Sequence, residues 1–344
     1  MPVEKGGADG RGPQHSPGSS ELLPAYRPLS VLVTGAAGFI GSHLSEALVA
    51  AGEDVVCVDS FDPFYDPAVK ERNLADLRTS DRFVEIRGDI RDPAAWLGAP
   101  EGVDAVVHLA ARAGVRPSIA EPALYADVNV TGTQRMLDFV RARRIGAVVF
   151  ASSSSVYGNS PAVPFSESAQ VYDPISPYAA TKLSGEMLCR TAHNLTGVSV
   201  VAARLFTVYG PRQRPDLAIH KFARLMRSGR PIPRFGDGTT ARDYTFVDDL
   251  VSGLIAALAH VRSGPQRFEV VNLGSDHPVT LNELITVLGE AIGVEPVVEQ
   301  LPAQPGDVER TWADISRARA LLGYEPRTPF PEGIRRFVGW LESA

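Results

Sequence analysis

The fold of this chain is decided by the stretch Thr34-Gly35-Ala36-Ala37-Gly38-Phe39-Ile40-Gly41. It follows an apolar run at residues 31–33, typical of a buried strand, and opens a helix expected over residues 41–51. Glycines in such a turn permit a tight bend and a close approach of the backbone to a pyrophosphate. The N-terminus of the following helix supplies unpaired N–H groups and the positive end of a dipole. Strand, turn and helix together predict a dinucleotide site.

Short apolar runs alternate with helical stretches on the C-terminal side of this turn. Strands are expected at residues 54–58, 83–86, 105–109 and 147–151. Strands buried on both faces carry continuous Val, Ile and Leu, and their alternation with helices is typical of a parallel sheet. The sequence therefore predicts an α/β fold with a Rossmann-type doubly wound parallel sheet.

The pattern changes after about residue 203, where Gly and Pro become frequent. Thr280-Leu281-Asn282-Glu283 is a capping box that opens a helix, and a helix over residues 315–322 is expected to end at Gly323. These segments predict a smaller C-terminal α/β substrate domain. We expect a disordered tail at residues 1–27 and a dinucleotide-binding domain at residues 28–205, with a return segment at about 239–273. The second domain takes residues 206–238 and 274–344.

Composition excludes several classes of partner. The 344 residues carry a net charge of −6 and show no basic cluster, so no nucleic-acid partner is expected. No stretch approaches the roughly 20 apolar residues of a membrane span. The two cysteines form neither a zinc spacing nor a disulfide framework, which predicts no metal and a reducing, cytoplasmic location. Residues 1–27 are rich in Gly, Pro and Ser and lack the apolar core of a signal peptide.

Asp59 stands at the end of the second expected strand. A carboxylate there accepts hydrogen bonds from both hydroxyls of the adenosine ribose and repels a 2′-phosphate. The dinucleotide is therefore expected to be NAD and not NADP.

The segment from residue 176 to residue 182 contains Tyr178 and Lys182, four positions apart. Residues with this spacing share one face of a helix, so the two side chains are expected to lie side by side. A nearby ammonium group stabilises a phenolate and lowers the pKa of tyrosine from its ordinary value of about 10. The pair predicts a tyrosine base.

These motifs resemble the extended short-chain dehydrogenase/reductase family, in its nucleotide-sugar epimerase branch. The spacing Gly-x-x-Gly-x-x-Gly, the Tyr-x-x-x-Lys pair and the Ser-rich segment at residues 151–158 carry the resemblance, which covers roughly residues 29–340. It implies that Ser153 joins Tyr178 and Lys182 as the third catalytic residue. It also implies NAD contacts from Gly35, Gly38, Phe39, Ile40, Gly41, Asp59, Asp89, Ile90, Leu109, Ala110, Ala111, Asn129, Tyr178 and Lys182.

The same resemblance implies a UDP-sugar substrate. Arg242, within Arg242-Asp243-Tyr244, takes the position that binds the substrate diphosphate in the family, and Phe235 stands where the uracil is bound. Asp307 matches the acidic residue that holds the uridine ribose. Many family members have Arg where Gln304 stands, so this chain departs from the pattern that implies a phosphate contact at this position.

The reaction is indicated by the triplet before Val156-Tyr157-Gly158. The family's common first step removes the 4-OH proton of the sugar with the tyrosine and passes the C4 hydride to NAD. The 4,6-dehydratases carry Thr-Asp-Glu at the triplet, and the UDP-glucuronate decarboxylases carry Thr-Ser-Glu. This chain has Ser153, Ser154 and Ser155, without a carboxyl group, which favours epimerisation.

The substrate is indicated by segments 62–67, 113–118 and 205–215, which resemble the UDP-glucuronate 4-epimerases. UDP-glucose 4-epimerases usually carry Asn where Thr207 stands. A hexuronate needs an anion site, and hydroxyl and guanidinium groups serve it well. The residues expected to bind substrate are Arg116, Ser153, Ser154, Ser155, Thr207, Arg214, Phe235, Arg242 and Asp307. Arg214 also remains a candidate for the diphosphate.

Rival interpretations stay open at this point. A UDP-glucose or UDP-N-acetylglucosamine 4-epimerase is the nearest, and a UDP-glucuronate decarboxylase comes next. A non-catalytic NAD-sensing regulator on the same fold would not need the catalytic set. The family commonly forms homodimers through two helices, here expected over residues 124–144 and 178–196.

Overall fold

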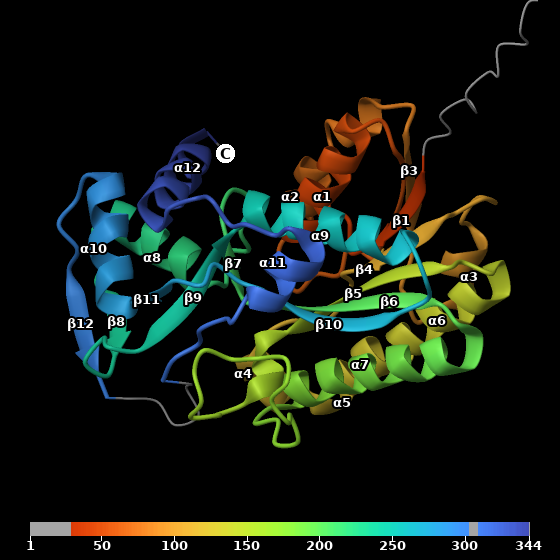
Figure 1. The fold of residues 1–344 in the computed structure, drawn as a ribbon. Helices are drawn as coiled ribbons and strands as arrows, with labels where there is room; N and C mark the ends of the chain where they lie inside the picture. Colours follow the sequence, from red (N-terminus) through yellow and green to blue (C-terminus); the bar gives the residue numbers. More distant parts are fainter. Residues whose placement is uncertain (1–28, 303–308, 344) are drawn as a thin grey trace, which may run out of the picture.

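The computed structural model describes residues 29–302 and 309–343. The tail expected at residues 1–27 and the predicted substrate residue Asp307 lie outside the described residues. Figure 1 shows a large open sheet with helices on both faces, and beside it a smaller group of short strands and helices.

The large sheet has seven parallel strands in the order β10-β6-β5-β4-β1-β2-β3. The strand order reverses between β1 and β4, and the carboxyl ends of these two strands form the switch point where doubly wound sheets bind ligands. The predicted Rossmann-type sheet is confirmed. Its strands are β1 Ser30–Thr34, β2 Asp54–Asp59, β3 Phe83–Arg87, β4 Ala105–His108, β5 Ala147–Ser153, β6 Ser199–Leu205 and β10 Phe268–Leu273.

Two strands of this sheet, β6 and β10, lie outside the strands that the sequence predicts. Each carries a polar residue that interrupts the apolar run, Arg204 in β6 and Asn272 in β10. Both side chains are buried and hydrogen-bonded inside the protein. Arg204 and Asn272 shorten the apolar runs of these two strands, and the partners that satisfy them are remote in sequence.

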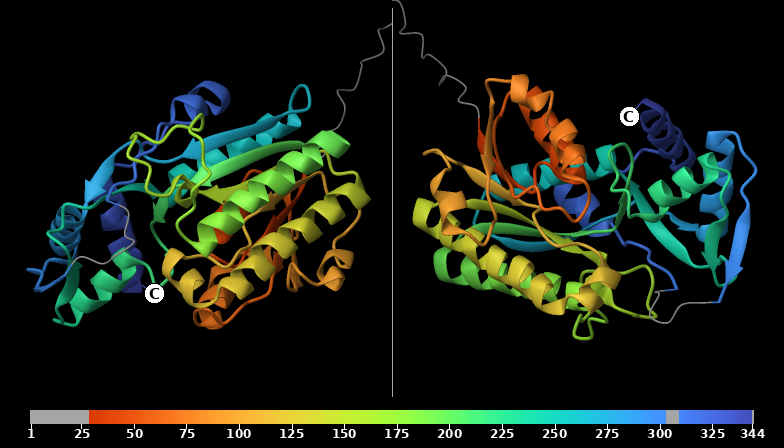
Figure 2. Two further views of the ribbon diagram at one scale, coloured as in Figure 1. Left: turned by 90° about the horizontal axis from the view of Figure 1, so that it is seen from below. Right: turned by 180° about the vertical axis from the view of Figure 1, so that it is seen from behind.

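Helices cover both faces of the large sheet. Helices α1 and α9 contact each other on one face, and α6 and α7 lie side by side on the other (Figures 1 and 2). The side chains of Val31 and Val33 join the core on the first face, whereas Leu32 joins the core on the second. The helices are α1 Phe39–Ala50, α2 Pro67–Asn73, α3 Pro93–Leu97, α4 Val115–Ala120, α5 Pro122–Ala126, α6 Gly132–Arg143, α7 Pro177–Thr196, α9 Val247–Arg262 and α11 Ser316–Leu322.

The helix expected over residues 124–144 is divided. A π-helical segment, Asp127–Thr131, separates α5 from α6. Such single-turn π segments often occur at functional sites, and this one contains the predicted cofactor residue Asn129. Among the described residues, no helix is both long and apolar enough to cross a membrane.

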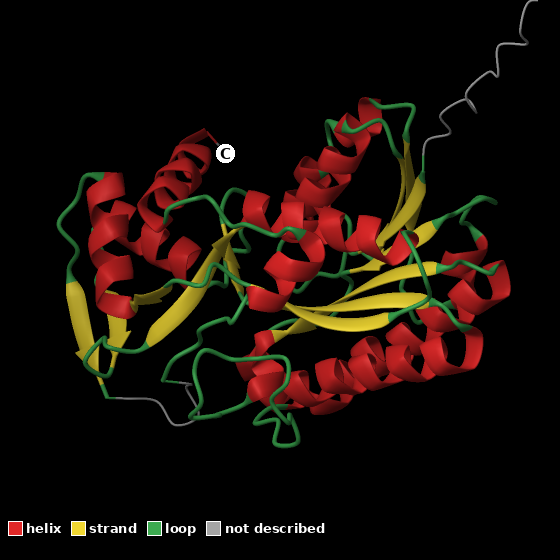
Figure 3. Ribbon diagram, in the orientation of Figure 1, coloured by secondary structure: helices red, strands yellow, loops and turns green. Residues whose placement is uncertain are grey.

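The smaller lobe contains two short sheets, seen beside its helices in Figure 3. The capping box opens its helix as predicted, since Thr280 Oγ1 accepts a hydrogen bond of 3.1 Å from the backbone N–H of Glu283. Gly323, with φ 63°, ends α11. The strands are β7 Thr207–Tyr209, β8 Ile232–Phe235, β9 Ala241–Phe246, β11 Pro278–Thr280 and β12 Val298–Leu301, and the helices are α8 Ala218–Arg227, α10 Leu281–Ile292 and α12 Phe330–Ser343.

Candidate active site

The glycine turn joins β1 to α1 at the switch point of the sheet. Gly35 has φ 71°, and a Cβ atom on it would lie 2.9 Å from the backbone nitrogen of Ala110. A Cβ atom on Gly41 would collide with the carbonyl oxygen of Gly35. Gly38 is the N-cap of α1, followed by Phe39 and Ile40 in the first helical turn. The close backbone approach and the helix N-terminus fit a dinucleotide pyrophosphate.

Asp59 is buried at the end of β2, beside the glycine turn. Its Oδ2 accepts a hydrogen bond of 3.2 Å from the backbone N–H of Ala37, and its Oδ1 accepts one of 2.8 Å from Phe61. The ammonium of Lys70 lies 3.2 Å from the same Oδ1. The structure thus fixes this carboxylate where the sequence predicts a contact with the adenosine ribose.

The turn after β4 lies against the glycine turn. The backbone N–H of Ala110 donates a hydrogen bond of 3.1 Å to Thr34 Oγ1. Leu109 and Ala111 flank it and are partly buried. These residues line the side of the switch point opposite α1, where the family resemblance implies contact with the cofactor.

Asp89 and Ile90 follow β3. Asp89 Oδ2 lies 2.6 Å from an Nη atom of Arg91, and this ion pair lowers the pKa of the Asp89 carboxyl. Ile90 is buried, and its backbone carbonyl accepts a hydrogen bond of 2.9 Å from Trp96. Both residues therefore form an ordered loop next to the carboxyl end of β2.

Asn129 connects the turn after β4 to α7. Its Oδ1 accepts a hydrogen bond of 2.8 Å from the backbone N–H of Arg112, and its Nδ2 donates one of 3.0 Å to Thr181 Oγ1. Asn129 is buried, so this bridge holds the cofactor side of the site against the helix that carries the tyrosine.

Tyr178 and Lys182 lie on α7, as the sequence predicts. Ser176 caps this helix by accepting a hydrogen bond of 3.1 Å from the backbone N–H of Ala179. The Lys182 ammonium donates a hydrogen bond of 2.8 Å to the carbonyl oxygen of Ala151 in β5, and it lies 5.9 Å from the centre of the Tyr178 ring. Helix α7 thus presents both side chains at the carboxyl end of β5.

The electrostatics of this pair depend on burial. Desolvation raises the pKa of Tyr178, while a hydrogen bond with Ser153 and the positive charge of Arg214 lower it. Desolvation lowers the pKa of Lys182 to about 8, so its ammonium is mostly protonated at neutral pH. Desolvation outweighs the other two effects, so the pKa of Tyr178 lies above its ordinary value, opposite to the direction expected from the sequence.

The three serines of the triplet follow directly on β5. Ser153 ends the strand, and its Oγ accepts hydrogen bonds from the backbone N–H of Ser155 at 3.2 Å and from the Ser155 hydroxyl at 2.9 Å. Ser154 and Ser155 begin a 3₁₀ turn, Ser154–Tyr157, and both are partly buried. The hydroxyl of Ser153 is held next to Tyr178, while Ser155 is turned toward Ser153.

Arg214 reaches the same site from the loop after β7. Its guanidinium is held by Asp216 at 3.0 and 2.8 Å, and it lies 5.4 Å from the centre of the Phe64 ring. Thr207 begins β7 and is partly buried. Arg214 therefore lies beside Tyr178, while Thr207 enters from a different sheet.

Arg116 and Phe235 come from different lobes. Arg116 lies in α4, and its guanidinium carbon is 5.9 Å from the centre of the Phe235 ring at the end of β8. Arg242 lies in β9, where its Nη1 donates a hydrogen bond of 2.9 Å to the carbonyl oxygen of Ala241. Phe235, the residue predicted to meet the uracil, therefore lies against α4 of the larger lobe.

The sequence reasoning assigned no role to several residues at this site. The Phe64 ring is near two guanidinium groups, that of Arg112 at 4.9 Å and that of Arg214 at 5.4 Å from the ring centre. Lys70 forms an ion pair with Asp59. The chain has only four lysines, and this scarcity was the feature of the sequence that could have indicated a role for Lys70. Glu186 follows Lys182 by four residues, just as Lys182 follows Tyr178. This spacing could have drawn attention to Glu186 in the sequence.

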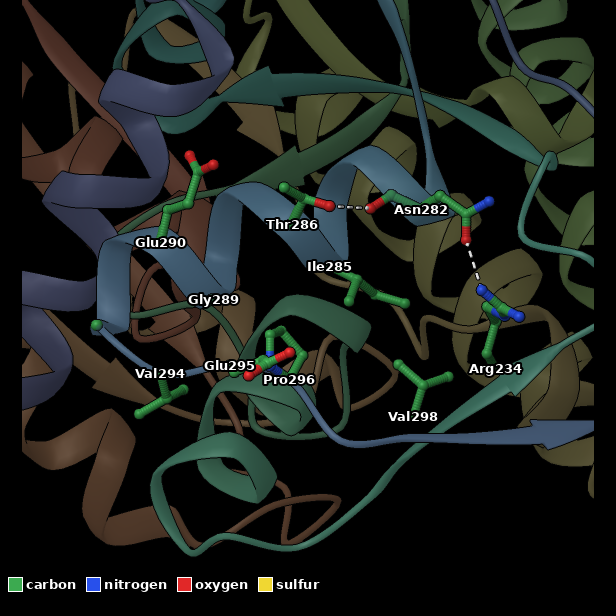
Figure 4. Close-up of a pocket in the computed structure, with 11 residues that line it drawn as sticks. Arg234, Asn282, Ile285, Thr286, Gly289, Glu290, Val294, Glu295, Pro296 and Val298 are labelled. Carbon is green, nitrogen blue, oxygen red and sulfur yellow. Dashed lines mark hydrogen bonds between the residues drawn. The ribbon is translucent and has the colours of Figure 1, made fainter.

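A separate hollow of about 570 Å³ lies between α10, β8 and β12 (Figure 4). Arg234 Nη1 donates a hydrogen bond of 3.1 Å to Asn282 Oδ1 at one end, and Ile285, Val294 and Val298 contribute apolar surface. No residue of the predicted site lines it. Within residues 29–302 and 309–343, no group of three or more His, Cys, Asp and Glu side chains is arranged to hold a metal ion.

Comparisons with known proteins agree with this geometry. Residues 31–274 match the model of the NAD-dependent epimerase/dehydratase family. A UDP-glucuronate 4-epimerase of Thermodesulfobacterium geofontis is 42% identical over 313 residues, which cover 90% of this chain and 95% of that protein.

Two solved structures are also similar. The UDP-glucuronic acid 4-epimerase of Bacillus cereus, in complex with UDP-glucuronic acid and NAD, is 37% identical with a TM-score of 0.85, covering 92% of this chain and 99% of that one. MoeE5, in complex with UDP-glucose and NAD, is 38% identical with a TM-score of 0.80, covering 91% and 99%. The family predicted from the sequence is confirmed, and so is NAD as its cofactor: this chain belongs to the NAD-dependent epimerase/dehydratase family.

Proposed function

We propose that this protein is a UDP-glucuronate 4-epimerase, which interconverts UDP-glucuronate and UDP-galacturonate. The observation that carries the proposal is the turn after β5, where three serine hydroxyls and no carboxyl group stand at the position of the triplet, next to Tyr178. Elimination and assisted decarboxylation both benefit from an acid at this triplet. Relatives that carry the name UDP-glucuronate 4-epimerase support the choice of substrate.

The cofactor end of the proposed site is made largely of backbone. Gly35, Gly38 and Gly41 would hold the pyrophosphate, and Asp59 would hold the adenosine ribose. Bound NAD supplies a reversible acceptor for the hydride of the sugar C4. Asp59 favours NAD because its carboxylate would meet the 2′-phosphate of NADP at close range.

Tyr178 is proposed to accept the proton of the sugar 4-OH. The hydrogen bond with Ser153 and the positive charge of Arg214 favour the phenolate form that this step requires. The Lys182 ammonium, 5.9 Å from the centre of the tyrosine ring, adds a second positive charge. General-base catalysis by a positioned side chain contributes about 10²–10⁴-fold to rate. The same tyrosine returns its proton when the 4-keto sugar has turned its other face and takes hydride back.

The carboxylate of the sugar is proposed to lie among the hydroxyls of Ser153, Ser154 and Thr207, with Arg214 as the neighbouring cation. Arg116, which was expected to share this role, lies instead 5.9 Å from the Phe235 ring at the proposed uracil end. Oxidation at C4 makes a β-keto acid, which loses CO₂ fastest when the bond to the carboxylate stands perpendicular to the keto group. Hydrogen bonds to a charged group are worth roughly 1.5–3 kcal/mol each, so several hydroxyls can hold that bond away from the perpendicular.

The nucleotide end is proposed to lie on the smaller lobe. Phe235 would meet the uracil, Arg242 the diphosphate, and Asp307, outside the described residues, the uridine ribose. The contact between Arg116 and Phe235 places a guanidinium beside this end. We propose accordingly that residues 206–238 and 274–344 form the UDP-sugar domain, and that residues 28–205 with 239–273 form the NAD domain. Two elements depart from this division, because β9 lies in the smaller lobe and α11 packs against α9 and β10 of the large sheet.

The proposal is tested with the purified protein and two substrates, UDP-glucuronate and UDP-glucose, with products separated by chromatography. We expect UDP-galacturonate at equilibrium with UDP-glucuronate, NAD that co-purifies, and no consumption of added NAD. A UDP-pentose with CO₂ would identify a decarboxylase, and faster conversion of UDP-glucose would identify the rival epimerase. NAD binding without turnover of either sugar would favour the sensor.

We also propose a cytoplasmic homodimer that forms through α6 and α7. Met187 and Leu195 are exposed on α7, and a shallow groove between the two helices is lined by Leu137, Val140 and Leu188 among others. The buried free thiols of the two cysteines are consistent with a reducing compartment. Light scattering should give twice the chain mass for the wild type and a monomer for Leu195→Glu, whereas a monomeric wild type would contradict the dimer.

A further inference from the structure

Helix α7 carries a third polar residue on the face of Tyr178 and Lys182. Glu186 follows Lys182 by four positions, and it is only 1% exposed. Its Oε1 accepts a hydrogen bond of 2.5 Å from the hydroxyl of Ser152, the residue immediately before Ser153. Three successive turns of α7 therefore contact three successive residues at the end of β5.

Arg204 completes the contact from the neighbouring strand. Its Nε and Nη2 each lie 2.9 Å from a different carboxylate oxygen of Glu186, and its side chain is 4% exposed. Arg204 is the register partner of Ser152 in the β5–β6 pairing. Glu186 thus holds both strands at one register position, directly before Ser153 and three residues before Thr207.

The close approach of α7 to β5 also fixes the position of the helix relative to Ser153. Gly185 lies next to Glu186, and a Cβ atom on it would collide with the buried ring of Phe150. The helix therefore rests on β5 at the distance that the Glu186 side chain needs to reach Ser152. A small change in this spacing would move Tyr178 relative to Ser153.

Stability alone does not account for such a pair. Removing two charges from water is costly, and replacing a buried ion pair by apolar side chains of similar volume is often neutral or stabilising. A buried pair beside the proposed catalytic residues is better explained by the geometry that it enforces.

We propose that Glu186, Arg204 and Ser152 are positioning residues, which together hold the Ser153 hydroxyl at hydrogen-bonding distance from Tyr178. The network acts on the reacting sugar only through Ser153 and Tyr178. This inference rests on the proposed function for the roles of those two residues.

Ser152→Ala is the most direct test, because it removes one hydroxyl and leaves the buried ion pair intact. We expect kcat to fall about tenfold, as for the loss of one hydrogen bond to a charged group. The KM for UDP-glucuronate should stay near its wild-type value, and the melting temperature should fall by no more than a few degrees, because the buried ion pair remains. Ser184→Ala is the matched control, because the Ser184 hydroxyl bonds only to Ala180 within α7, and it should leave kcat unchanged.

A double-mutant cycle shows whether the network acts through Ser153. The variant Ser152→Ala/Ser153→Ala should be no slower than Ser153→Ala alone, because coupled positions are not additive. A second variant, Glu186→Leu/Arg204→Met, exchanges the ion pair for apolar side chains. It should melt at or above the wild-type temperature and still lose kcat about as strongly as Ser152→Ala.

The inference would be overturned if Ser152→Ala kept the wild-type kcat. It would also be overturned if the losses of kcat in Ser152→Ala and Ser153→Ala simply added in the double variant. Full activity in a folded Glu186→Leu/Arg204→Met protein would overturn it as well; if that variant does not fold, Ser152→Ala and the cycle decide. Every variant is assayed with both UDP-glucuronate and UDP-glucose. If the wild type prefers UDP-glucose but the relative loss in Ser152→Ala persists, the proposed substrate fails and the positioning role stands.

Discussion

The cofactor side and the substrate side of the site are built in different ways. On the cofactor side, residues 34–41 form one continuous turn, and Asp59 is placed by the end of the adjacent strand. On the substrate side, Ser153, Thr207 and Phe235 arrive from three different sheets. The first side works through backbone groups whose placement follows from local sequence. The second works through side chains whose meeting depends on how the two lobes pack.

Tyr178 stands where the two sides meet, so its removal should have the largest effect. Tyr178→Phe deletes the hydroxyl and keeps the ring, which contacts Tyr125 edge-on at 6.3 Å. We expect kcat to fall by about 10²–10⁴-fold, because the proton acceptor is lost. The NAD content of the purified protein, read from its absorbance after release, should remain that of the wild type. Near-normal turnover would remove Tyr178 from the proposed role.

A substitution at Asp59 should change the cofactor preference most selectively. Asp59→Ala removes the carboxylate and frees the Lys70 ammonium, now 3.2 Å from it, to meet a 2′-phosphate. We expect the ratio of NAD to NADP affinity to fall by about a hundredfold, since both a repulsion and a competing ion pair are lost. Titration of the cofactor-free protein with each dinucleotide measures the ratio. Asp59→Ala/Lys70→Ala is the control, and it should lose most of the gain in NADP binding.

The substrate side is tested at Thr207, which no local motif positions. Thr207→Ala should slow epimerisation and raise the fraction of UDP-4-keto-pentose by about tenfold, because a hydrogen bond to the carboxylate is lost. CO₂ release and accumulation of NADH report the change. Thr207→Asn should also improve the relative use of UDP-glucose. If both variants partition as the wild type does, Thr207 does not bind the carboxylate and Arg214 is the remaining candidate.

The smallest effect expected is on the pH dependence of kcat. Burial lowers the pKa of Lys182 to about 8, so its charge is present below that pH and is lost above it. Because this charge favours the Tyr178 phenolate, kcat should decline by a few fold as pH rises from about 8 to about 9. Lys182→Met should be slower throughout and should lack this decline. A wild-type profile that keeps rising through pH 9 would contradict the role of the lysine charge.

The sequence predicted the fold from particular elements and missed others. The strands β1, β2, β4 and β5 were visible because their apolar runs are continuous, and β3 was predicted although Glu85 interrupts its run. The strands β6 and β10 were missed; Arg204 and Asn272 shorten their apolar runs, and each is satisfied only by partners remote in sequence. The start of helix α10 was predicted because its capping box is local. The π segment around Asn129 was not predicted, because no local pattern of residues indicates it.

For the site, the sequence by itself determined the parts that depend on neighbours along the chain. The glycine turn and the pairing of Tyr178 with Lys182 follow from spacing, because helix and strand geometry fixes short-range contacts. The absence of a carboxyl group from the serine triplet is read directly from the residues. The tertiary structure alone decided the contact between Arg116 and Phe235 and the network of Ser152, Glu186 and Arg204. Those contacts join elements that are distant along the chain, and only the packing of α7 and of the smaller lobe against the large sheet brings them together.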